Sequence, residues 1–272
     1  MLSTTFFSFY LFSFFILSSC FKTNRMWQIG HRGFPDKYGD NNMVSFLKAQ
    51  EVGFDMIELD IQLCGTGEIV VYHDTWINHQ YINETPYEKL KEFNMVLLDD
   101  VFEAFVNTKM MLFLDIKGSE KVVDPLKVMI DKWFSRVELH RIYISGFNRK
   151  FVKELKQPHL RYHLGFTTEN TFSVDQLDFL CKDMDFVCLH WTALDKEAVD
   201  FLHGKGILVF TYTCKDEFIL KHILDYDIDG IVSNYFITDK TSSPSLTKRI
   251  STQSFGSLFK DSEFQSNFEF GS

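Results

Sequence analysis

The sequence predicts a single (β/α)8 barrel, also called a TIM barrel, on three observations. From Met26 onward, short apolar runs alternate with segments of helical periodicity, which is the pattern of βαβ units. Eight such runs separated by seven helical segments within about 215 residues match the number that a compact barrel needs. No glycine-rich phosphate turn follows the first run, although a doubly wound open sheet, the alternative fold, often has one.

Each barrel strand is predicted from an apolar run, and each helix from the periodic segment that follows it. The predicted strands are Trp27–Gly30, Met56–Gln62, Met110–Ile116, Arg141–Ser145, Leu160–Gly165, Phe186–Leu189, Ile207–Tyr212 and Gly230–Val232. The predicted helices are Met43–Val52, Leu98–Val106, Val122–Trp133, Arg149–Leu155, Val174–Leu180, Lys196–His203 and Glu217–Leu224. A turn at 64–67 followed by the β-rich run Glu68–Tyr72 predicts a strand that turns back as a small excursion, and 74–97 is predicted to be a loop or small insertion.

The two ends of the chain differ in composition from the predicted barrel, which we assign to residues 26–240. Residues 1–25 contain the apolar run Phe6–Phe21, which fits a signal or anchor segment and would make the protein secreted or membrane-associated. If translation starts at Met26 instead, the protein is expected in the cytoplasm. Residues 241–272 are rich in Ser and Phe without clear periodicity, so a disordered tail is expected.

The net charge argues against nucleic acid as a partner, and the cysteine spacing argues against a zinc site. The formal net charge of −9 argues against a nucleic-acid groove, which normally needs a basic face, but leaves room for a local phosphate site. The five cysteines show no zinc-like spacing and no paired motif, so reduced and mostly buried thiols are expected.

Polar residues cluster where the early predicted strands end, which is where the functional groups of a TIM barrel lie. The first strand ends in Gly30-His31-Arg32-Gly33, the second carries Glu58-Leu59-Asp60, the excursion ends in His73-Asp74, and the third strand ends in Asp115-Ile116-Lys117. Side chains two apart on a strand share a face, so Glu58 projects with Asp60, and Asp115 with Lys117.

Three carboxylates in one barrel mouth are costly to bury without compensation, because like charges resist ionising together. A divalent cation relieves that cost. Oxygen ligands of this kind suit Mg²⁺ or Ca²⁺ better than zinc. The residues therefore predict one divalent cation held by Glu58, Asp60 and Asp115.

These four segments, in this order, resemble the glycerophosphodiester phosphodiesterase family, which has a phosphatidylinositol-phosphodiesterase-like TIM barrel. The likeness continues into Asp229–Tyr235 and spans Met26 to about Lys240. The resemblance implies His31 and His73 as the general acid and base, Glu58, Asp60 and Asp115 as metal ligands, and Arg32 and Lys117 as phosphate contacts. It leaves open which histidine is the acid.

Three positions depart from the family pattern. Asp40-Asn41-Asn42 stands where Glu-Asn-Thr is usual, and Asp40 keeps a carboxylate for substrate binding on a shorter side chain. Asp115 stands where Glu is commoner, and Trp76–His79 follows His73-Asp74 where an arginine-rich stretch is usual. Trp191, after the sixth strand, and Phe210, near the end of the seventh with Tyr212, are candidates for lining the pocket.

The resemblance implies hydrolysis of a small-molecule glycerophosphodiester to glycerol 3-phosphate and an alcohol. Within the same fold, the alternative is a lipid phosphodiesterase that acts on a lysophospholipid or on sphingomyelin, as a lysophospholipase D or a sphingomyelinase D does. An alternative of another class is an inactive barrel that binds phospholipid head groups or a protein. The oligomeric state and the alcohol stay open.

Overall fold

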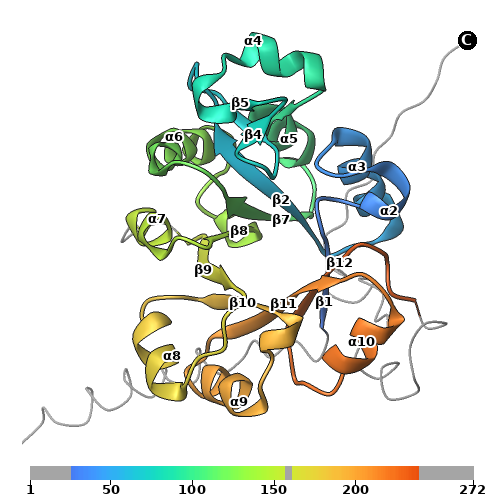
Figure 1. Ribbon diagram of the computed structural model, residues 1–272, viewed down its shortest axis with the longest axis vertical. Coiled ribbons are helices and arrows are strands. Elements are labelled where there is room, and N and C mark those ends of the chain that lie inside the picture. Colours follow the sequence, from blue (N-terminus) through green and yellow to red (C-terminus); the bar gives the residue numbers. More distant parts are fainter. Residues whose placement is uncertain (1–25, 157–160, 239–272) are drawn as a thin grey trace, which may run out of the picture.

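The computed structural model describes residues 26–156 and 161–238, and within them it confirms the predicted (β/α)8 barrel. Parallel strands follow one another around the barrel, and β1 pairs with both the last strand and the second, which closes it. The barrel strands are β1 (Trp27–Gly30), β2 (Met56–Leu63), β7 (Met111–Ile116), β8 (Ile142–Gly146), β9 (His163–Thr168), β10 (Phe186–His190), β11 (Leu208–Cys214) and β12 (Gly230–Ser233). Figure 1 looks into the ring that these strands form.

Helices cover the outside of the ring. The α-helices around it are α2 (Pro35–Tyr38), α3 (Met43–Val52), α5 (Leu98–Phe105), α6 (Val123–Trp133), α7 (Arg149–Glu154), α8 (Val174–Leu180), α9 (Lys196–Gly204) and α10 (Glu217–Ile223). Short 3₁₀ turns join them to strands at η3 (Glu120–Val122), η4 (Leu139–Arg141) and η5 (Trp191–Ala193). Local signals set their ends: Asn42 caps α3 by accepting from Ser45 N at 2.9 Å, and Gly53 ends it in the left-handed region.

Side chains alternate between two cores along each strand. Ile57 and Leu59 of β2 pack outward against the helices, whereas Met56 points into the barrel. The barrel interior is filled at one level by a buried apolar layer, to which β2, β7, β10 and β11 contribute large side chains. The buried members of this layer are Ile29, Met56, Phe113, Tyr143, Phe186, Cys188, Phe210 and Val232.

Two predicted strand ends were placed two or three residues too early. β9 runs to Thr168 rather than Gly165, and β11 runs to Cys214 rather than Tyr212. Both extensions add threonines, Thr167 and Thr213 among them, which are polar and therefore do not prolong an apolar run. The upper part of the barrel interior is itself polar, so these residues continue the strand there. The predicted start at Leu160 lies outside the described residues.

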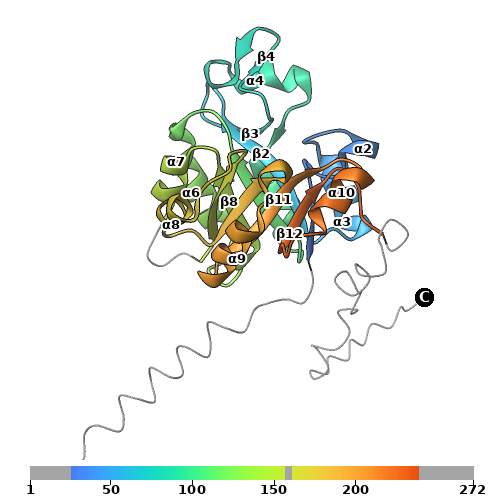
Figure 2. The same cartoon turned by 60° about the horizontal axis from the view of Figure 1, so that its bottom comes forward.

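The excursion after β2 is a small structure in its own right rather than a loop. β3 (Ile69–Val71) pairs antiparallel with β2 as expected, and β6 (Val96–Leu97) pairs with β3. Between them lie β4 (Trp76–Ile77), β5 (Gln80–Tyr81), η1 (Ile82–Glu84), α4 (Tyr87–Leu90) and η2 (Lys91–Phe93). Their side chains form a separate apolar cluster with Val70 at its base. Figure 2 shows the excursion projecting from one side of the barrel.

The described residues include four of the five cysteines but neither end of the chain. The cysteines within the described residues, Cys64, Cys181, Cys188 and Cys214, are buried and free. The expected signal or anchor segment, the Ser/Phe-rich tail and Cys20 lie outside the described residues. Among the helices of the described part, none combines the length and apolar character that crossing a bilayer requires.

Candidate active site

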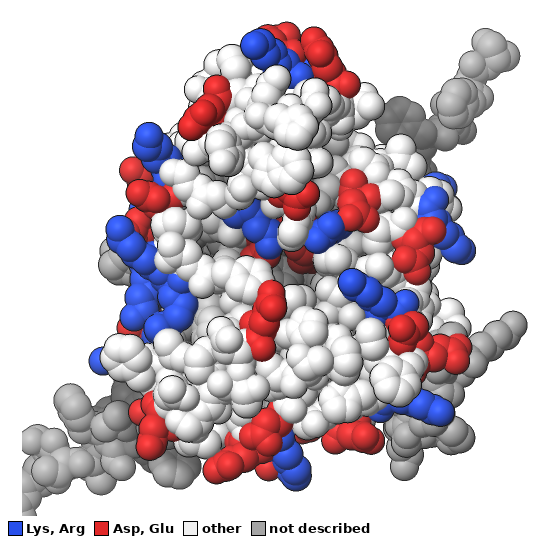
Figure 3. All heavy atoms as spheres, viewed as in Figure 1, with Lys and Arg blue, Asp and Glu red and all other residues white. Residues whose placement is uncertain are grey.

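A cavity opens at the carboxyl ends of the barrel strands, on the face seen in Figure 3. That face is hollowed near its centre, where acidic and basic side chains meet. The lining combines charged, polar and aromatic groups, and most of the charged ones come from the early strands and the excursion. The lining residues are His31, Arg32, Glu58, Asp60, His73, Phe113, Asp115, Lys117, Phe147, Thr167, Glu169, Cys188, Tyr212, Thr213, Lys215 and Val232.

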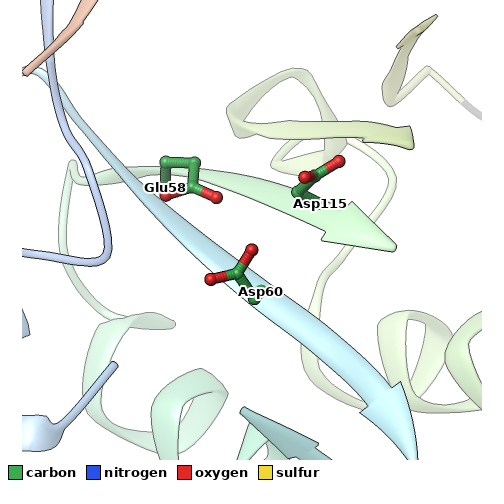
Figure 4. Close-up of side chains that lie close together, drawn as sticks. All are labelled: Glu58, Asp60 and Asp115. Atoms are coloured by element: carbon green, nitrogen blue, oxygen red, sulfur yellow. The ribbon is translucent and has the colours of Figure 1, made fainter. Parts of the chain in front are cut away.

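Three buried carboxylates meet inside this cavity. Glu58 and Asp60 project from β2, and Asp115 projects from the neighbouring strand β7, where it is in register with Asp60. One oxygen from each of the three lies within 4.8 Å of the others. Figure 4 shows the three side chains gathered beside the two strands. The alternation of side chains along β2 and β7 therefore produces the predicted cluster.

Burial makes the ionised forms of two of these carboxylates unfavourable. The pKa of Glu58 is raised well above its usual range by burial first and then by the charges of Asp60 and Asp115. The pKa of Asp115 is raised by burial as well, although Lys117 acts against the rise. The apolar layer that includes Phe113 lies directly beneath them and excludes water, which is the physical origin of the penalty.

Asp60 is in the opposite situation because two cations flank it. Lys117 Nζ lies 3.2 Å from Asp60 Oδ1, and Arg32 Nε lies 3.1 Å from Asp60 Oδ2. Burial alone would raise the pKa of Asp60, but Lys117 and Arg32 outweigh it and the pKa is lowered. Lys117 Nζ also lies 2.5 Å from Asp115 Oδ2, and these carboxylates raise the pKa of the ammonium despite its burial.

The donor set fits a divalent cation. Glu58, Asp60 and Asp115 carry three negative charges, whereas Arg32 and Lys117 carry two positive ones, so the buried cluster keeps an excess of acceptor oxygens. Hard oxygen donors within a few ångströms of one another are the ligands that Mg²⁺ and Ca²⁺ take in proteins. A cation there would also remove the repulsion that raises the pKa of Glu58.

A tight turn after β1 positions His31 and Arg32. Arg32 lies in the left-handed region at φ 54°, and its backbone N–H donates to Glu58 Oε2 at 2.8 Å. Gly33 follows at φ 97°, where an added Cβ would lie 2.4 Å from Ser45 Oγ. The turn therefore requires glycine at this position.

His31 is anchored on the wall of the cavity. Its Nδ1 lies 2.8 Å from Asn234 Oδ1, just past β12. Burial, followed by the charge of Arg32, lowers the pKa of His31 to about 4, although Asn234 acts against the change. The ring is therefore neutral at physiological pH. With Nδ1–H donating to the amide oxygen, Nε2 carries the free lone pair.

His73 lines the same cavity from the excursion and is more exposed. Its Nδ1 lies 2.7 Å from Asp74 Oδ1, so the Asp74 carboxylate orients the ring. Gln62, at the end of β2, donates from Nε2 to the carbonyl oxygens of Tyr72 and Asp74 at 2.7 and 2.8 Å. Gln62 thereby fixes the backbone on both sides of His73.

Asp40 lies outside the cavity lining and contacts Arg32 instead. Its Oδ2 lies 2.7 Å from Arg32 Nη1, so the shorter carboxylate orients the guanidinium. The next residue, Asn41, reaches the cluster itself, donating from Nδ2 to Asp60 Oδ2 at 2.8 Å. Asn41 lies in the left-handed region at φ 51°, a conformation that asparagine tolerates better than most residues.

Of the three aromatic residues expected to line the cavity, one does so. Phe210 is fully buried in the apolar layer, and Trp191 packs outside the barrel, with its ring 5.7 Å from that of His222. Neither lines the cavity. Tyr212 does, because it follows Phe210 by one strand repeat and so lies one layer nearer the mouth. Phe147 joins it from the loop after β8.

Several residues in or next to the cavity belong to none of the sequence motifs. Ser145 and Thr167 join β8 to β9 by a 2.7 Å contact between their hydroxyls, and Ser145 donates to Asp115 Oδ1 at 3.3 Å. Glu169 and Lys215 follow β9 and β11 at the rim. The twofold repeat of β8 and β9, extended past each apolar run, is the signal that finds Ser145, Thr167 and Glu169, whereas Lys215 follows a register shift in β11.

Comparison with known proteins agrees with this geometry. Residues 31–238 match the model of the glycerophosphoryl diester phosphodiesterase family. A glycerophosphodiester phosphodiesterase of Bacillus altitudinis is 24% identical over 229 residues, covering 75% of this chain and 93% of its own. A lysophospholipase D of Mus musculus is 23% identical over 261 residues, covering 76% of this chain and 82% of its own.

The solved structures share the fold. An Oleispira antarctica phosphodiesterase in complex with the product sn-glycerol-3-phosphate superposes with a TM-score of 0.68 at 21% identity. It covers 77% of this chain and 93% of its own. One from Galdieria sulphuraria, described as a glycerophosphodiester phosphodiesterase, gives a TM-score of 0.66 at 24% identity, over 77% of this chain and 94% of its own.

Proposed function

Because the chain belongs to the glycerophosphoryl diester phosphodiesterase family, we propose that it hydrolyses glycerophosphodiesters to glycerol 3-phosphate and an alcohol. The proposal includes a divalent cation, Mg²⁺ or Ca²⁺, on Glu58, Asp60 and Asp115, and an acid–base pair of His31 and His73. One observation carries it: the buried carboxylate cluster lies in the same cavity as both histidines and two cations.

We assign His31 as the general base. Its ring is neutral, and Asn234 fixes Nδ1, so Nε2 is the atom that accepts a proton from the attacking water. The water oxygen bonds to phosphorus, and the bond from phosphorus to the leaving alcohol oxygen breaks. His73 gives that oxygen its proton, and the contact between its Nδ1 and Asp74 Oδ1 orients the ring for the transfer.

Arg32 and Lys117 bind the phosphoryl oxygens in this scheme. Both already contact carboxylates in the cavity, so each turns from Asp60 or Asp115 toward the substrate phosphate when it binds. The divalent cation supplies Lewis-acid stabilisation of the charge that develops on those oxygens. Asp40 keeps the guanidinium of Arg32 oriented through its 2.7 Å contact.

The test is hydrolysis of glycerophosphocholine by the full chain with Mg²⁺, Ca²⁺ or EDTA. We expect turnover that depends on the metal and falls by about 10³-fold or more in His31→Ala and in His73→Ala. His140→Ala is the matched control, because His140 is exposed and does not line the cavity. Turnover that persists in EDTA or in both cavity variants would contradict the proposal.

A lysophospholipid is the second candidate substrate. The phenyl ring of Phe147 is 49% exposed at the cavity, a surface on which an acyl chain can pack. The relatives include a lysophospholipase D from mouse. Choline release from glycerophosphocholine and from lysophosphatidylcholine, compared in wild type and Phe147→Ala, separates the two. Absence of turnover on both would favour a barrel that only binds head groups.

We further propose that residues 1–25 act as a signal or anchor and that 241–272 lie outside the catalytic domain. The apolar run Phe6–Phe21 supports the first proposal. Fractionation of cells that express the full chain, beside a chain starting at Met26, tests it. Equal distribution of the two forms between membrane and soluble fractions would count against it.

A further inference from the structure

Tyr212 has a polar atom that the protein leaves without a partner. Its hydroxyl oxygen is buried from solvent and makes no hydrogen bond within the described residues. A buried hydroxyl without a partner is unfavourable, and folded proteins therefore rarely keep one without a reason. Arg32 Nε is also buried without a hydrogen bond, but Asp60 lies 3.1 Å from it as an ion-pair partner.

The position of the Tyr212 ring is fixed by its neighbours. The His190 ring meets it edge-on at 5.3 Å, and the Phe147 ring does so at 6.4 Å. His190 is itself held by a 2.7 Å contact between Nδ1 and Thr192 Oγ1. The hydroxyl therefore stays in the cavity rather than rotating to find a partner among the residues around it.

The phenol is a donor under all working conditions. Burial raises its pKa, and Cys188, Glu169 and Asp115 add to the rise. None of these groups accepts a hydrogen bond from it within the described chain. Because none of these neighbours accepts its hydrogen bond, the protonated hydroxyl can donate to a ligand that carries acceptor oxygens.

Phe147 connects Tyr212 to the phosphate-binding side of the cavity. Lys117 Nζ lies 5.2 Å from the centroid of the Phe147 ring, and Tyr212 packs against the same ring. Asp115, which pairs with Lys117, is among the charges that act on the Tyr212 hydroxyl. Tyr212 and Lys117 thus approach one region of the cavity from two strands, β11 and β7.

We propose that the Tyr212 hydroxyl donates a hydrogen bond to a non-bridging oxygen of the bound phosphodiester. This rests on the proposed function and adds a substrate contact to it. The oxygens of the phosphate gain charge in the transition state, so the bond strengthens as the reaction proceeds. The unpaired hydroxyl of the free enzyme is then satisfied only when substrate is bound.

The test compares Tyr212→Phe with wild type on glycerophosphocholine and on bis(p-nitrophenyl) phosphate, which has no glycerol. We expect kcat/KM to fall about 10- to 100-fold on both substrates, with most of the loss in kcat. The thermal midpoint of the metal-free variant should equal or exceed that of wild type, because Phe removes an unsatisfied group. Tyr143→Phe is the matched control, since Tyr143 is buried in the barrel without lining the cavity.

The outcomes separate the two proposals. An inactive wild type refutes the proposed function. An active wild type with an equally active Tyr212→Phe refutes only the tyrosine contact. A loss on glycerophosphocholine alone would move the hydrogen bond to a glycerol hydroxyl and overturn the phosphoryl assignment. A loss accompanied by a lowered thermal midpoint would indicate a structural hydroxyl instead. Calorimetric titration with sn-glycerol 3-phosphate, where we expect about tenfold weaker binding to the variant, gives a readout independent of turnover.

Discussion

Asn234 holds His31 across the seam where the barrel closes. The amide oxygen lies just past the last strand and the imidazole just past the first, and the two atoms are 2.8 Å apart. The contact selects the tautomer of His31 and the direction of its free nitrogen. Closure of the sheet and orientation of the proposed base therefore depend on the same pair of strands.

Replacing Asn234 with Leu should lower kcat about 10- to 100-fold while leaving the fold intact, because the imidazole loses the acceptor that fixes its tautomer. Steady-state kinetics with circular dichroism as a check on folding would measure it. Asn234→Asp is the informative comparison, since a carboxylate still accepts from Nδ1. If the Leu and Asp variants turn over as fast as wild type, the contact has no role in orientation.

The pH dependence should follow the buried state of His31. Its pKa is about 4 instead of 6.5, so the neutral base persists until the pH falls through about 4. At saturating divalent cation, we expect kcat/KM to stay high down to about pH 5 and to decline below it. An acid limb centred near 6.5 would assign the base to a solvated histidine instead.

Divalent cations should stabilise the fold, and more so at higher pH. The folded-state pKa values of Glu58 and Asp115 are raised, so the metal-free cluster loses stability as pH rises through their unfolded values near 4 and on toward the raised ones. Bound metal removes the repulsion between the carboxylates and competes with protons for their oxygens. Scanning fluorimetry should show a larger rise in thermal midpoint at pH 8 than at pH 5. The opposite order would argue against these ligands.

Lys117→Met should separate metal binding from turnover. Lys117 contacts Asp115 and Asp60 at 2.5 and 3.2 Å, so it competes with a cation for the same oxygens. We expect the variant to bind Ca²⁺ several-fold more tightly at pH 8, yet to hydrolyse diesters at least about 100-fold more slowly. Calorimetry and kinetics together test this, with exposed Lys121→Met as control. Weaker Ca²⁺ binding would mean that Lys117 supports the ligands rather than competing with the ion.

Arg141 should prove to be a structural residue at the opposite end of the barrel. Its guanidinium is buried and donates to the backbone oxygens of Thr108, Val106 and Met110 at 2.7, 2.9 and 3.0 Å. Arg141→Met leaves these acceptors unpaired and should reduce the free energy of unfolding by about 3 kcal/mol or more. Urea titration measures the loss, with exposed Arg136→Met as control. Equal midpoints for the two variants would refute the role.

The strands and their inward faces were predictable because periodicity is a local property. Glu58 and Asp60 had to share a face once β2 was recognised, and the barrel then placed Asp115 beside them. Asn41 and Asn234 were harder, since each contributes through a contact with a residue distant in sequence. Asn41 reaches Asp60 only because a left-handed residue redirects the chain.

Phe210 and Trp191 were predicted to line the pocket, and their actual positions could not be predicted from the sequence pattern. An aromatic residue at the end of a strand is equally compatible with the floor, the wall or the outside of a barrel. Which applies depends on the height at which the apolar layer ends, and that height is set by side chains from all the strands. The same holds for the excursion, whose short strands and turns are stabilised by their own cluster rather than by any strong local signal.

The apolar layer beneath the carboxylates also determines how substrate and products enter and leave the cavity. Phe113, Phe186 and Phe210 pack against one another across the interior, with Phe113 and Phe186 edge to face, and all three rings are buried. The proposed diester, water and cation would therefore reach the cluster from the mouth, and both product fragments would leave through the same opening. Because substrate and products use the same opening, both products must leave the cavity before the next substrate can bind.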